Sequence, residues 1–294
     1  MTKAYLFPGQ GFQHVGMGKN LYDQFSLARD YFEHANELLG YRITDYMFYG
    51  PEEKLLETQI AQNAIYLSSL IGALKEGKDF QPFMVAGHSL GETTALVANG
   101  CLSFEDGLLL MDERSLEMEK AFKAVTSCMV AVLGVEDAVV ERICEETGEL
   151  VSPANYNCPG QLVIAGTKLG VELACKELTK AGARRIIKLQ VGGAVHSPLM
   201  QPVVNYLKNK LPTLKFREPN CPIYPNVTGV ATIDLNEIKQ YLTLQQIKSL
   251  QWTTTIRNML LDGANEFVDC GPPHVISGMV RRISKEILIN SAGV

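Results

Sequence analysis

The sequence predicts an α/β fold in which helices cover a parallel sheet and a smaller subdomain with its own sheet is inserted into the larger domain. Two observations support this prediction. Segments typical of strands and helices alternate through residues 1–124 and again after residue 197, and such alternation favours a parallel sheet between layers of helices. Between these parts, the predicted order changes to strand, helix, strand, strand, helix, strand, which is typical of a compact split βαβ unit.

The first part contains a loop of small residues and a sharp corner, each directly after a predicted strand. The loop is Pro8–Gln13 and the corner is Gly87–Gly91. Ligands gather at the carboxyl ends of parallel strands, so we expect a site at this edge of the sheet. The predicted elements are a strand over 3–7, helices over 21–39 and 62–74, a strand over 83–86, a helix through Val97 and a helix over 104–122.

The inserted part has the βαββαβ order of a ferredoxin-like subdomain. It is predicted to contain strands over 128–133, 150–154, 161–165 and 185–189, helices over 136–146 and 171–181, and a turn over 155–160. The chain then continues with a helix over 198–211, a strand over 222–226, a helix over 252–261 and a strand over 266–269. We therefore expect a large domain of residues 1–124 and 197–294 and an inserted subdomain of residues 125–196.

The composition is that of a globular protein and argues against several classes of partner. The 294 residues are 46% hydrophobic and carry a net charge of −5, with basic and acidic residues interspersed, so no basic stripe is present to bind nucleic acid. The N-terminus lacks the long apolar region of a signal peptide, and no apolar stretch approaches the length of a membrane span. The seven cysteines form no CxxC pair and no zinc-like cluster. We expect a cytoplasmic protein with reduced thiols, no metal and no cofactor.

The pentapeptide Gly87-His88-Ser89-Leu90-Gly91 places one serine between two glycines at a strand-to-helix corner. The glycines let the backbone turn sharply and leave the hydroxyl of Ser89 exposed, while the start of the helix directs backbone N–H groups at an oxyanion. This arrangement indicates a serine nucleophile and an acyl-transfer reaction. A short pattern of this kind also occurs in ordinary tight turns.

A base is needed to take the proton of the serine, and histidine is the usual choice. His88 lies beside Ser89 and is expected to point away from it. Two candidates remain, His196 in a loop before a helix and His274 after the last predicted strand. The late position of the histidine in α/β-hydrolases slightly favours His274, but the pattern alone leaves both open.

Arg114 borders the apolar face of the helix predicted over 104–122. A guanidinium can hold a carboxylate through two parallel hydrogen bonds, so Arg114 is a candidate for recognising an acidic substrate. The alternative is an ordinary ion pair with Glu117 on the same helix or exposure to solvent.

Motifs spread over nearly the whole chain resemble those of the malonyl-CoA:acyl carrier protein transacylases of type II fatty-acid synthesis and the related acyltransferase domains of polyketide synthases. The resemblance rests on Phe7-Pro8-Gly9-Gln10-Gly11, Gly87–Glu92, Arg114 with Met118, Ala154–Gln161, His196–Met200, Asn226–Gly229, and Gln245 before Trp252. It implies an α/β-hydrolase-like domain interrupted by a ferredoxin-like one, and a monomer without a cofactor. It also implies two partners, malonyl-CoA and acyl carrier protein.

The resemblance also assigns roles to individual residues. Ser89 is implied as the nucleophile that carries the malonyl group, and His196, not His274, as its base, oriented by a backbone carbonyl near Gln245. Arg114 is implied to bind the malonyl carboxylate. The backbone N–H groups of Gln10 and Leu90 are implied to form the oxyanion hole, Gln245 to bind substrate, and Asn155 and Gln161 to support the site.

The sequence departs from the family pattern at several positions near these motifs. Thr93 stands where an aromatic residue is common, Val195 replaces a phenylalanine before the histidine, Ser249 replaces a frequent proline, and residues 271–274 replace a GPGK-like turn. The exchange at Val195 leaves open a polyketide acyltransferase with another extender unit.

Two further alternatives are a hydrolase or thioesterase of the same fold that uses His274, and a non-catalytic subunit that binds the carrier protein. Lys180, Arg184 and Lys188 are candidates for contact with the carrier protein.

Overall fold

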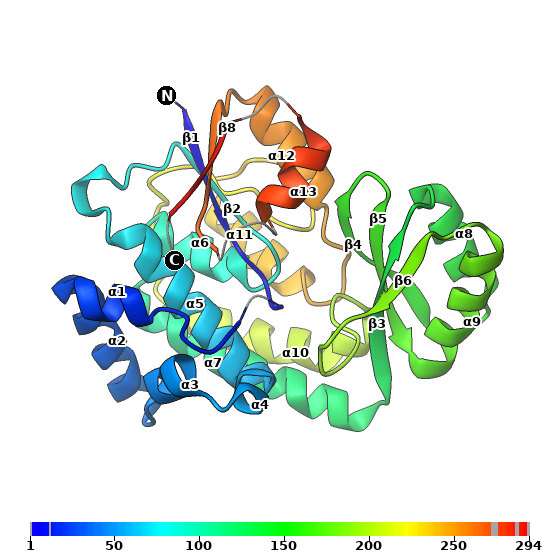
Figure 1. Cartoon of the computed structure of the whole chain (residues 1–294), viewed down its shortest axis with the longest axis horizontal. Helices are drawn as coiled ribbons and strands as arrows, with labels where there is room; N and C mark the ends of the chain where they lie inside the picture. Colours follow the sequence, from blue (N-terminus) through cyan, green and yellow to red (C-terminus); the bar gives the residue numbers. More distant parts are fainter. Residues whose placement is uncertain (1, 12, 272–275, 286–287, 293–294) are drawn as a thin grey trace.

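Two separate sheets organise the chain, of which the computed structural model describes residues 2–11, 13–271, 276–285 and 288–292 (Figure 1). The first sheet has the strand order β2-β1-β7-β8, and each neighbouring pair is parallel. Its strands are β1 (Lys3–Phe7), β2 (Met84–Gly87), β7 (Glu266–Asp269) and β8 (Leu288–Ser291). The predicted parallel sheet is confirmed.

Helices cover both faces of this sheet because its central strand is apolar on both sides. Tyr5 and Phe7 of β1 belong to one hydrophobic core, whereas Ala4 and Leu6 belong to another that includes Trp252. Alternating side chains of a strand point to opposite faces, so β1 contributes to both cores. The helices are α1 (Lys19–Gln24), α2 (Ser26–Leu39), α3 (Ile43–Tyr49), α4 (Glu52–Leu55), α5 (Thr58–Leu74), α6 (Gly91–Ala98), α7 (Phe104–Ala124), α10 (Gln201–Lys210), α11 (Leu235–Leu244), α12 (Trp252–Leu261) and α13 (Ile276–Ile283).

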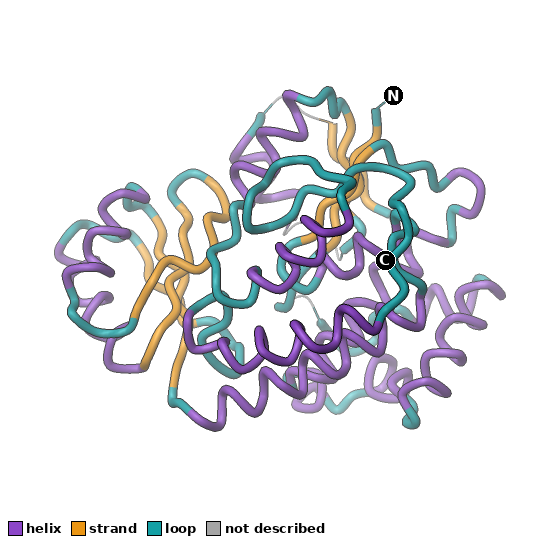
Figure 2. Tube along the Cα trace, turned by 180° about the vertical axis from the view of Figure 1, so that it is seen from behind, coloured by secondary structure: helices purple, strands orange, loops and turns teal. Residues whose placement is uncertain are grey.

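The second sheet has the order β4-β5-β3-β6, and each neighbouring pair is antiparallel. This is the ferredoxin-like arrangement that the βαββαβ pattern predicts. Figure 2 shows the two sheets as separate groups of strands, and Figure 1 shows α7 leading from the first group into β3. The elements are β3 (Ser127–Leu133), α8 (Asp137–Glu146), β4 (Val151–Cys158), β5 (Gln161–Thr167), α9 (Lys168–Lys180) and β6 (Arg185–Lys188). The domain limits at residues 125 and 196 stay a prediction.

Four predicted elements differ in the structure. The helix predicted over 198–211 is an α-helix only over Gln201–Lys210, with a 3-10 turn on each side. The helix predicted over 21–39 is two helices, because Phe25 between them adopts an extended conformation with φ −121° and ψ 118°. The turn predicted over 155–160 is shorter, since β4 continues through Cys158 with two irregular pairings. The strand predicted over 222–226 forms only isolated bridges of Ile223 to Val85 and Thr232. Prolines at 222 and 225 lack the N–H groups that a regular ladder requires.

A seam of hydrogen bonds joins the two sheets' domains at the edge of β4. The backbone N–H of Leu250 donates to the Ala154 carbonyl at 2.8 Å, and Tyr156 N–H donates to the Leu250 carbonyl at 2.9 Å. Ser249 adds a bond from its hydroxyl to the Pro153 carbonyl at 2.7 Å. The segment before α12 therefore extends the second sheet.

None of the described helices is long and apolar enough to cross a membrane. All seven cysteines are free thiols.

Candidate active site

Ser89 lies at the corner between β2 and α6, with a left-handed backbone conformation of φ 55°. The flanking glycines make this corner possible. A Cβ atom on Gly87 would lie 1.8 Å from the Gly91 carbonyl oxygen, and one on Gly91 would lie 2.3 Å from the Phe7 carbonyl oxygen. No side chain fits at such distances, so glycine is needed at both positions. The strained φ is typical of a serine that is held out for reaction.

His196 is the candidate base that the structure brings to this serine. Ser89 Oγ lies 2.8 Å from His196 Nε2, and His196 Nδ1 lies 2.7 Å from the backbone carbonyl oxygen of Gln245. A carbonyl only accepts hydrogen bonds, so Nδ1 carries the proton and Nε2 is left to accept from the serine. Burial lowers the pKa of His196 to about 3, which keeps the imidazole neutral. His274, the other candidate, lies outside the described residues.

Two residues that the sequence did not single out for the site fix the serine corner. Asn226 Oδ1 accepts from the backbone N–H of Ser89 at 2.8 Å, and Asn226 Nδ2 donates to the Gly87 carbonyl at 2.6 Å. The carboxylate of Glu92 accepts from the backbone N–H of Asn226 at 2.7 Å. Both residues belong to quoted motifs, but the strand assignment over 222–226 gave Asn226 no functional role.

Arg114 is buried beside the same residues, with 2% of its surface exposed. Its guanidinium donates to three side-chain carbonyl oxygens, namely Gln62 at 2.8 Å, Gln246 at 3.1 Å and Gln245 at 3.4 Å. Burial lowers its pKa to about 10, so Arg114 is still a cation at neutral pH. Because all three acceptors are neutral, this cation has no carboxylate in direct contact among the described residues.

The two ordinary explanations for Arg114 do not apply. Arg114 is not exposed, and Glu117 instead accepts from Lys120 at 2.6 Å on the solvent side of α7. Gln62 and Gln246, which surround the guanidinium, were missed by the sequence analysis. The available signal was Gln62, a polar residue among the apolar residues of the helix predicted over 62–74.

The loop after β1 packs against the serine corner. A Cβ atom on Gly9 would lie 2.8 Å from the His88 carbonyl oxygen, so the two segments are in close contact. Among the described residues, none accepts from the backbone N–H of Gln10 or of Leu90. His88 itself is directed elsewhere, as predicted, because its Nε2 donates to Asn157 at 2.9 Å. Two free N–H groups on packed segments suit an oxyanion.

Comparison with known proteins places this geometry in a family. The family model described as "Acyl transferase domain" matches residues 4–285. The malonyl CoA-acyl carrier protein transacylase of Bacillus subtilis is 37% identical over 289 residues, covering 97% of this chain and 91% of that protein. The chain belongs to the malonyl CoA-acyl carrier protein transacylase family.

Solved structures of transacylases agree with this assignment. The enzyme from Xanthomonas oryzae superposes with a TM-score of 0.94 at 36% identity, covering 99% of this chain and 94% of that one. A malonyl-transacylase in complex with a type II polyketide synthase acyl-carrier protein gives a TM-score of 0.95 at 32% identity, covering 99% and 96%. The α/β-hydrolase-like domain with a ferredoxin-like insertion is thereby confirmed.

Two positions that the transacylase resemblance assigns as supporting residues lie apart from the hydrogen bonds around Ser89. Asn155 is buried on β4, where it forms an isolated bridge with Leu250. Gln161 begins β5 and accepts from Arg282 at 3.0 Å. No described hydrogen bond links either side chain to the serine or its base.

Three of the four departures from the transacylase pattern lie wholly among the described residues. Ser249, in place of proline, donates to β4 at the seam described above. Val195 packs against the hydrophobic cores of both domains, next to the base. Thr93 is buried on α6. The exchange at 271–274 falls on the boundary of the described residues.

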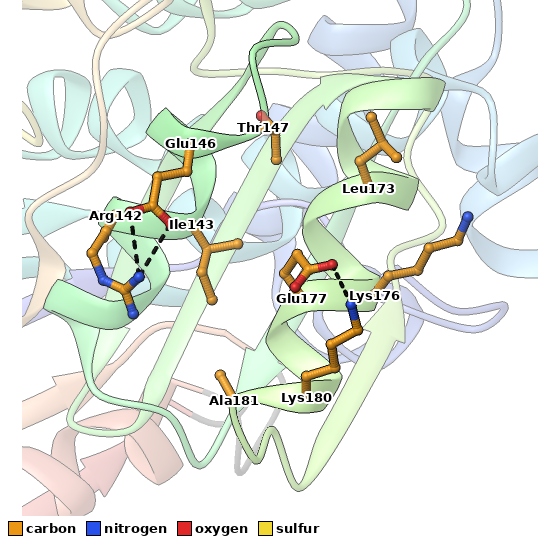
Figure 3. Close-up of a pocket in the computed structure, with 9 residues that line it drawn as sticks. All are labelled: Arg142, Ile143, Glu146, Thr147, Leu173, Lys176, Glu177, Lys180 and Ala181. Atoms are coloured by element: carbon orange, nitrogen blue, oxygen red, sulfur yellow. Dashed lines mark hydrogen bonds and ion pairs between the residues drawn. The ribbon is translucent and has the colours of Figure 1, made fainter.

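A hollow on the inserted domain is distinct from this site. It has a volume of about 590 Å³ and lies between α8 and α9 (Figure 3). Two of its cations are already paired, because Arg142 donates to Glu146 at 3.1 Å and Lys180 donates to Glu177 at 2.7 Å. Figure 1 shows both helices on the outer side of the small sheet, away from the first sheet. This hollow therefore has no part in the chemistry of Ser89.

Proposed function

We propose that the chain moves a malonyl group from malonyl-CoA to the phosphopantetheine thiol of acyl carrier protein, through a malonyl ester on Ser89. One observation supports this most strongly: the Ser89–His196 pair lies beside a buried cation that has no carboxylate in direct contact. A nucleophile with its base can form an acyl ester, and the cation selects an acyl group with a free carboxylate.

In the first half-reaction, Ser89 Oγ attacks the thioester carbonyl carbon as its proton passes to His196 Nε2. The Gln245 carbonyl, which accepts from Nδ1, stabilises the imidazolium that forms. The negative oxygen binds the backbone N–H groups of Gln10 and Leu90, each contributing about 3 kcal/mol to lowering the barrier.

The intermediate then collapses. The C–S bond breaks, the proton returns from His196 to the sulfur, and coenzyme A leaves as the thiol. In the second half-reaction, His196 takes the proton of the carrier-protein thiol, whose sulfur attacks the ester. Ser89 regains its proton as the new thioester leaves, so the two halves form a ping-pong cycle.

Arg114 is the proposed reader of the malonyl carboxylate. A guanidinium has five N–H donors, and three of them are used by the glutamines. Two donors remain for a bidentate bond to a carboxylate. The glutamine side chains fix the orientation of the guanidinium without neutralising its positive charge.

The carrier protein, the cytoplasmic location and the monomeric state belong to this proposal as well. Of the basic positions predicted to contact the carrier protein, Lys180 is paired with Glu177. Arg184 instead lines a hollow of about 380 Å³ together with Arg185 and Arg282. We therefore favour Arg184 for this contact.

Intact-protein mass spectrometry after mixing with malonyl-CoA tests the proposal. We expect a malonyl adduct on the wild-type chain, none on Ser89→Ala, and loss of the adduct when carrier protein with its phosphopantetheine is added. Release of free malonate without transfer would indicate the hydrolase. The absence of any adduct would indicate a subunit without catalytic activity.

A further inference from the structure

The proposed mechanism leaves one buried carboxylate of the site without a role. Glu92, on the first turn of α6, is 2% exposed. Its Oε2 accepts two hydrogen bonds, from the backbone N–H of Asn226 at 2.7 Å and from Gln245 Nε2 at 3.0 Å. Among the described residues, no donor bonds to Oε1. Burying a charged side chain is costly, so its presence at this position calls for a function.

The two donors that Glu92 holds are those that orient the reacting groups. Asn226 accepts from the backbone N–H of Ser89 and donates to the Gly87 carbonyl, so it fixes the corner that carries the nucleophile. Gln245 supplies the carbonyl that accepts from His196 Nδ1, so it fixes the base. A single oxygen atom of Glu92 therefore connects the support of the nucleophile with the support of the base.

The side chain of Gln245 also contacts the backbone of Ser89 directly. Gln245 Nε2, besides bonding to Glu92, lies 3.0 Å from the Ser89 carbonyl oxygen and 3.3 Å from Asn226 Oδ1. All the groups involved are buried or nearly so, and in such surroundings each unsatisfied polar atom is costly. A loss of the acceptor at Glu92 Oε2 would leave the backbone N–H of Asn226 unsatisfied and would remove one of the three acceptors around Gln245 Nε2, so the network would have to rearrange.

We propose that Glu92 is a positioning residue for acyl transfer: Oε2 holds Asn226 and Gln245 in register, and through them sets Ser89 Oγ against His196 Nε2. This inference rests on the proposed function and names a further residue of the same site. The proposal attributes the alignment of Ser89 and His196 to how far the acceptor oxygen of Glu92 extends from the backbone, here called its reach, and not to the negative charge.

The distinction between reach and charge makes the proposal testable with two conservative variants. Glu92→Gln keeps an oxygen at the same distance from the backbone, able to accept both bonds, and removes the charge. Glu92→Asp keeps the charge and withdraws the oxygens by one methylene group. If reach matters, the glutamine variant is the active one.

The experiment measures single-turnover acylation of Ser89 by malonyl-CoA, with KM from the steady state. We expect Glu92→Gln to acylate within about fivefold of wild type, and Glu92→Asp and Glu92→Ala to be slower by roughly 100-fold, the loss typical of small misplacements of reacting groups. KM for malonyl-CoA should change less than the acylation rate, and stay within about threefold for Glu92→Gln, because Gln62 and Gln246, which make the two shorter bonds to Arg114, have no hydrogen bond to Glu92 among the described residues.

Thr94→Val is the matched control. Thr94 is buried on the same helix, and its hydroxyl has no hydrogen-bond partner among the described residues. The control should acylate at the wild-type rate. It shows that a change of a buried polar group in α6 is not sufficient to slow the reaction.

An aspartate variant as fast as or faster than the glutamine variant would overturn the proposal in favour of a charge effect. So would a rise in KM at unchanged acylation rate, or wild-type rates in all three variants. If Glu92→Ala does not fold, the comparison of glutamine with aspartate still decides. A wild-type chain that forms no malonyl ester would instead refute the proposed function, so the two failures are distinguishable.

Discussion

Replacing Arg114 by alanine tests how this site distinguishes an acidic acyl group from a neutral one. In the proposed function, the two guanidinium donors that the glutamines leave unused form hydrogen bonds to the malonyl carboxylate. Each bond to a charged partner contributes about 1.5–3 kcal/mol, so the pair contributes about 3–6 kcal/mol to binding malonyl. This corresponds to a loss of roughly 10²- to 10⁴-fold in kcat/KM for malonyl-CoA. Acetyl-CoA has no carboxylate and should lose little.

A competition assay measures this change directly. Wild type and Arg114→Ala are mixed with equal amounts of malonyl-CoA and acetyl-CoA, and the two esters on Ser89 are resolved by intact mass. Arg142→Ala serves as the matched control, because Arg142 is exposed and paired with Glu146 on the inserted domain. We expect the ratio of malonyl to acetyl ester to fall only in the Arg114 variant.

The reasoning about Arg114 would be refuted by an unchanged ratio in a folded Arg114→Ala chain. It would also be refuted by equal losses for both acyl groups, since that result assigns Arg114 to the architecture of the site and not to recognition of the carboxylate.

Three further outcomes follow from the geometry. Gly87→Ala should destabilise the chain by about 3 kcal/mol in urea unfolding because its Cβ would collide with backbone, whereas Gly278→Ala, with nothing near its Cβ, should be neutral or stabilising. His196→Ala should slow acylation by roughly 10²- to 10⁴-fold, and a comparable loss in His274→Ala would show that the wrong base was assigned. Burial raises the pKa of Glu92 from 4.5 to about 7, so the folded state binds this proton more tightly and wild type loses stability as pH rises through that range. Glu92→Gln lacks this loss, so its free energy of unfolding in urea, relative to that of wild type, should increase by about 3 kcal/mol between pH 4.5 and pH 8. A difference that does not depend on pH would contradict the raised pKa of Glu92.

Patterns within short stretches of sequence predicted those helices and turns whose conformation depends on residues close together in the chain. The helix predicted over 252–261 has those limits in the structure, since its apolar spacing follows a single helical face. The serine corner was predictable for the same reason, because Gly87 and Gly91 lie within two residues of Ser89.

The partners of the serine were not predictable from local patterns. Asn226 lies 137 residues from Ser89 along the chain, and proline residues around it obscured its segment. The choice between His196 and His274 came from the resemblance to a family and not from periodicity. The surroundings of Arg114 were not predictable without the fold, because Gln62 on α5 and the pair Gln245 and Gln246 directly after α11 lie 52, 131 and 132 residues away along the chain.

The seam at β4 gives the inserted sheet a share in the catalytic geometry. Gln245, whose carbonyl holds the base, and Leu250, which pairs with β4, are five positions apart on one short connection between α11 and α12. The same short connection thus bonds to His196 at one end and to the edge strand β4 of the small sheet at the other. We therefore expect any displacement of the small sheet relative to the large domain to move the Gln245 carbonyl and, with it, the imidazole of His196.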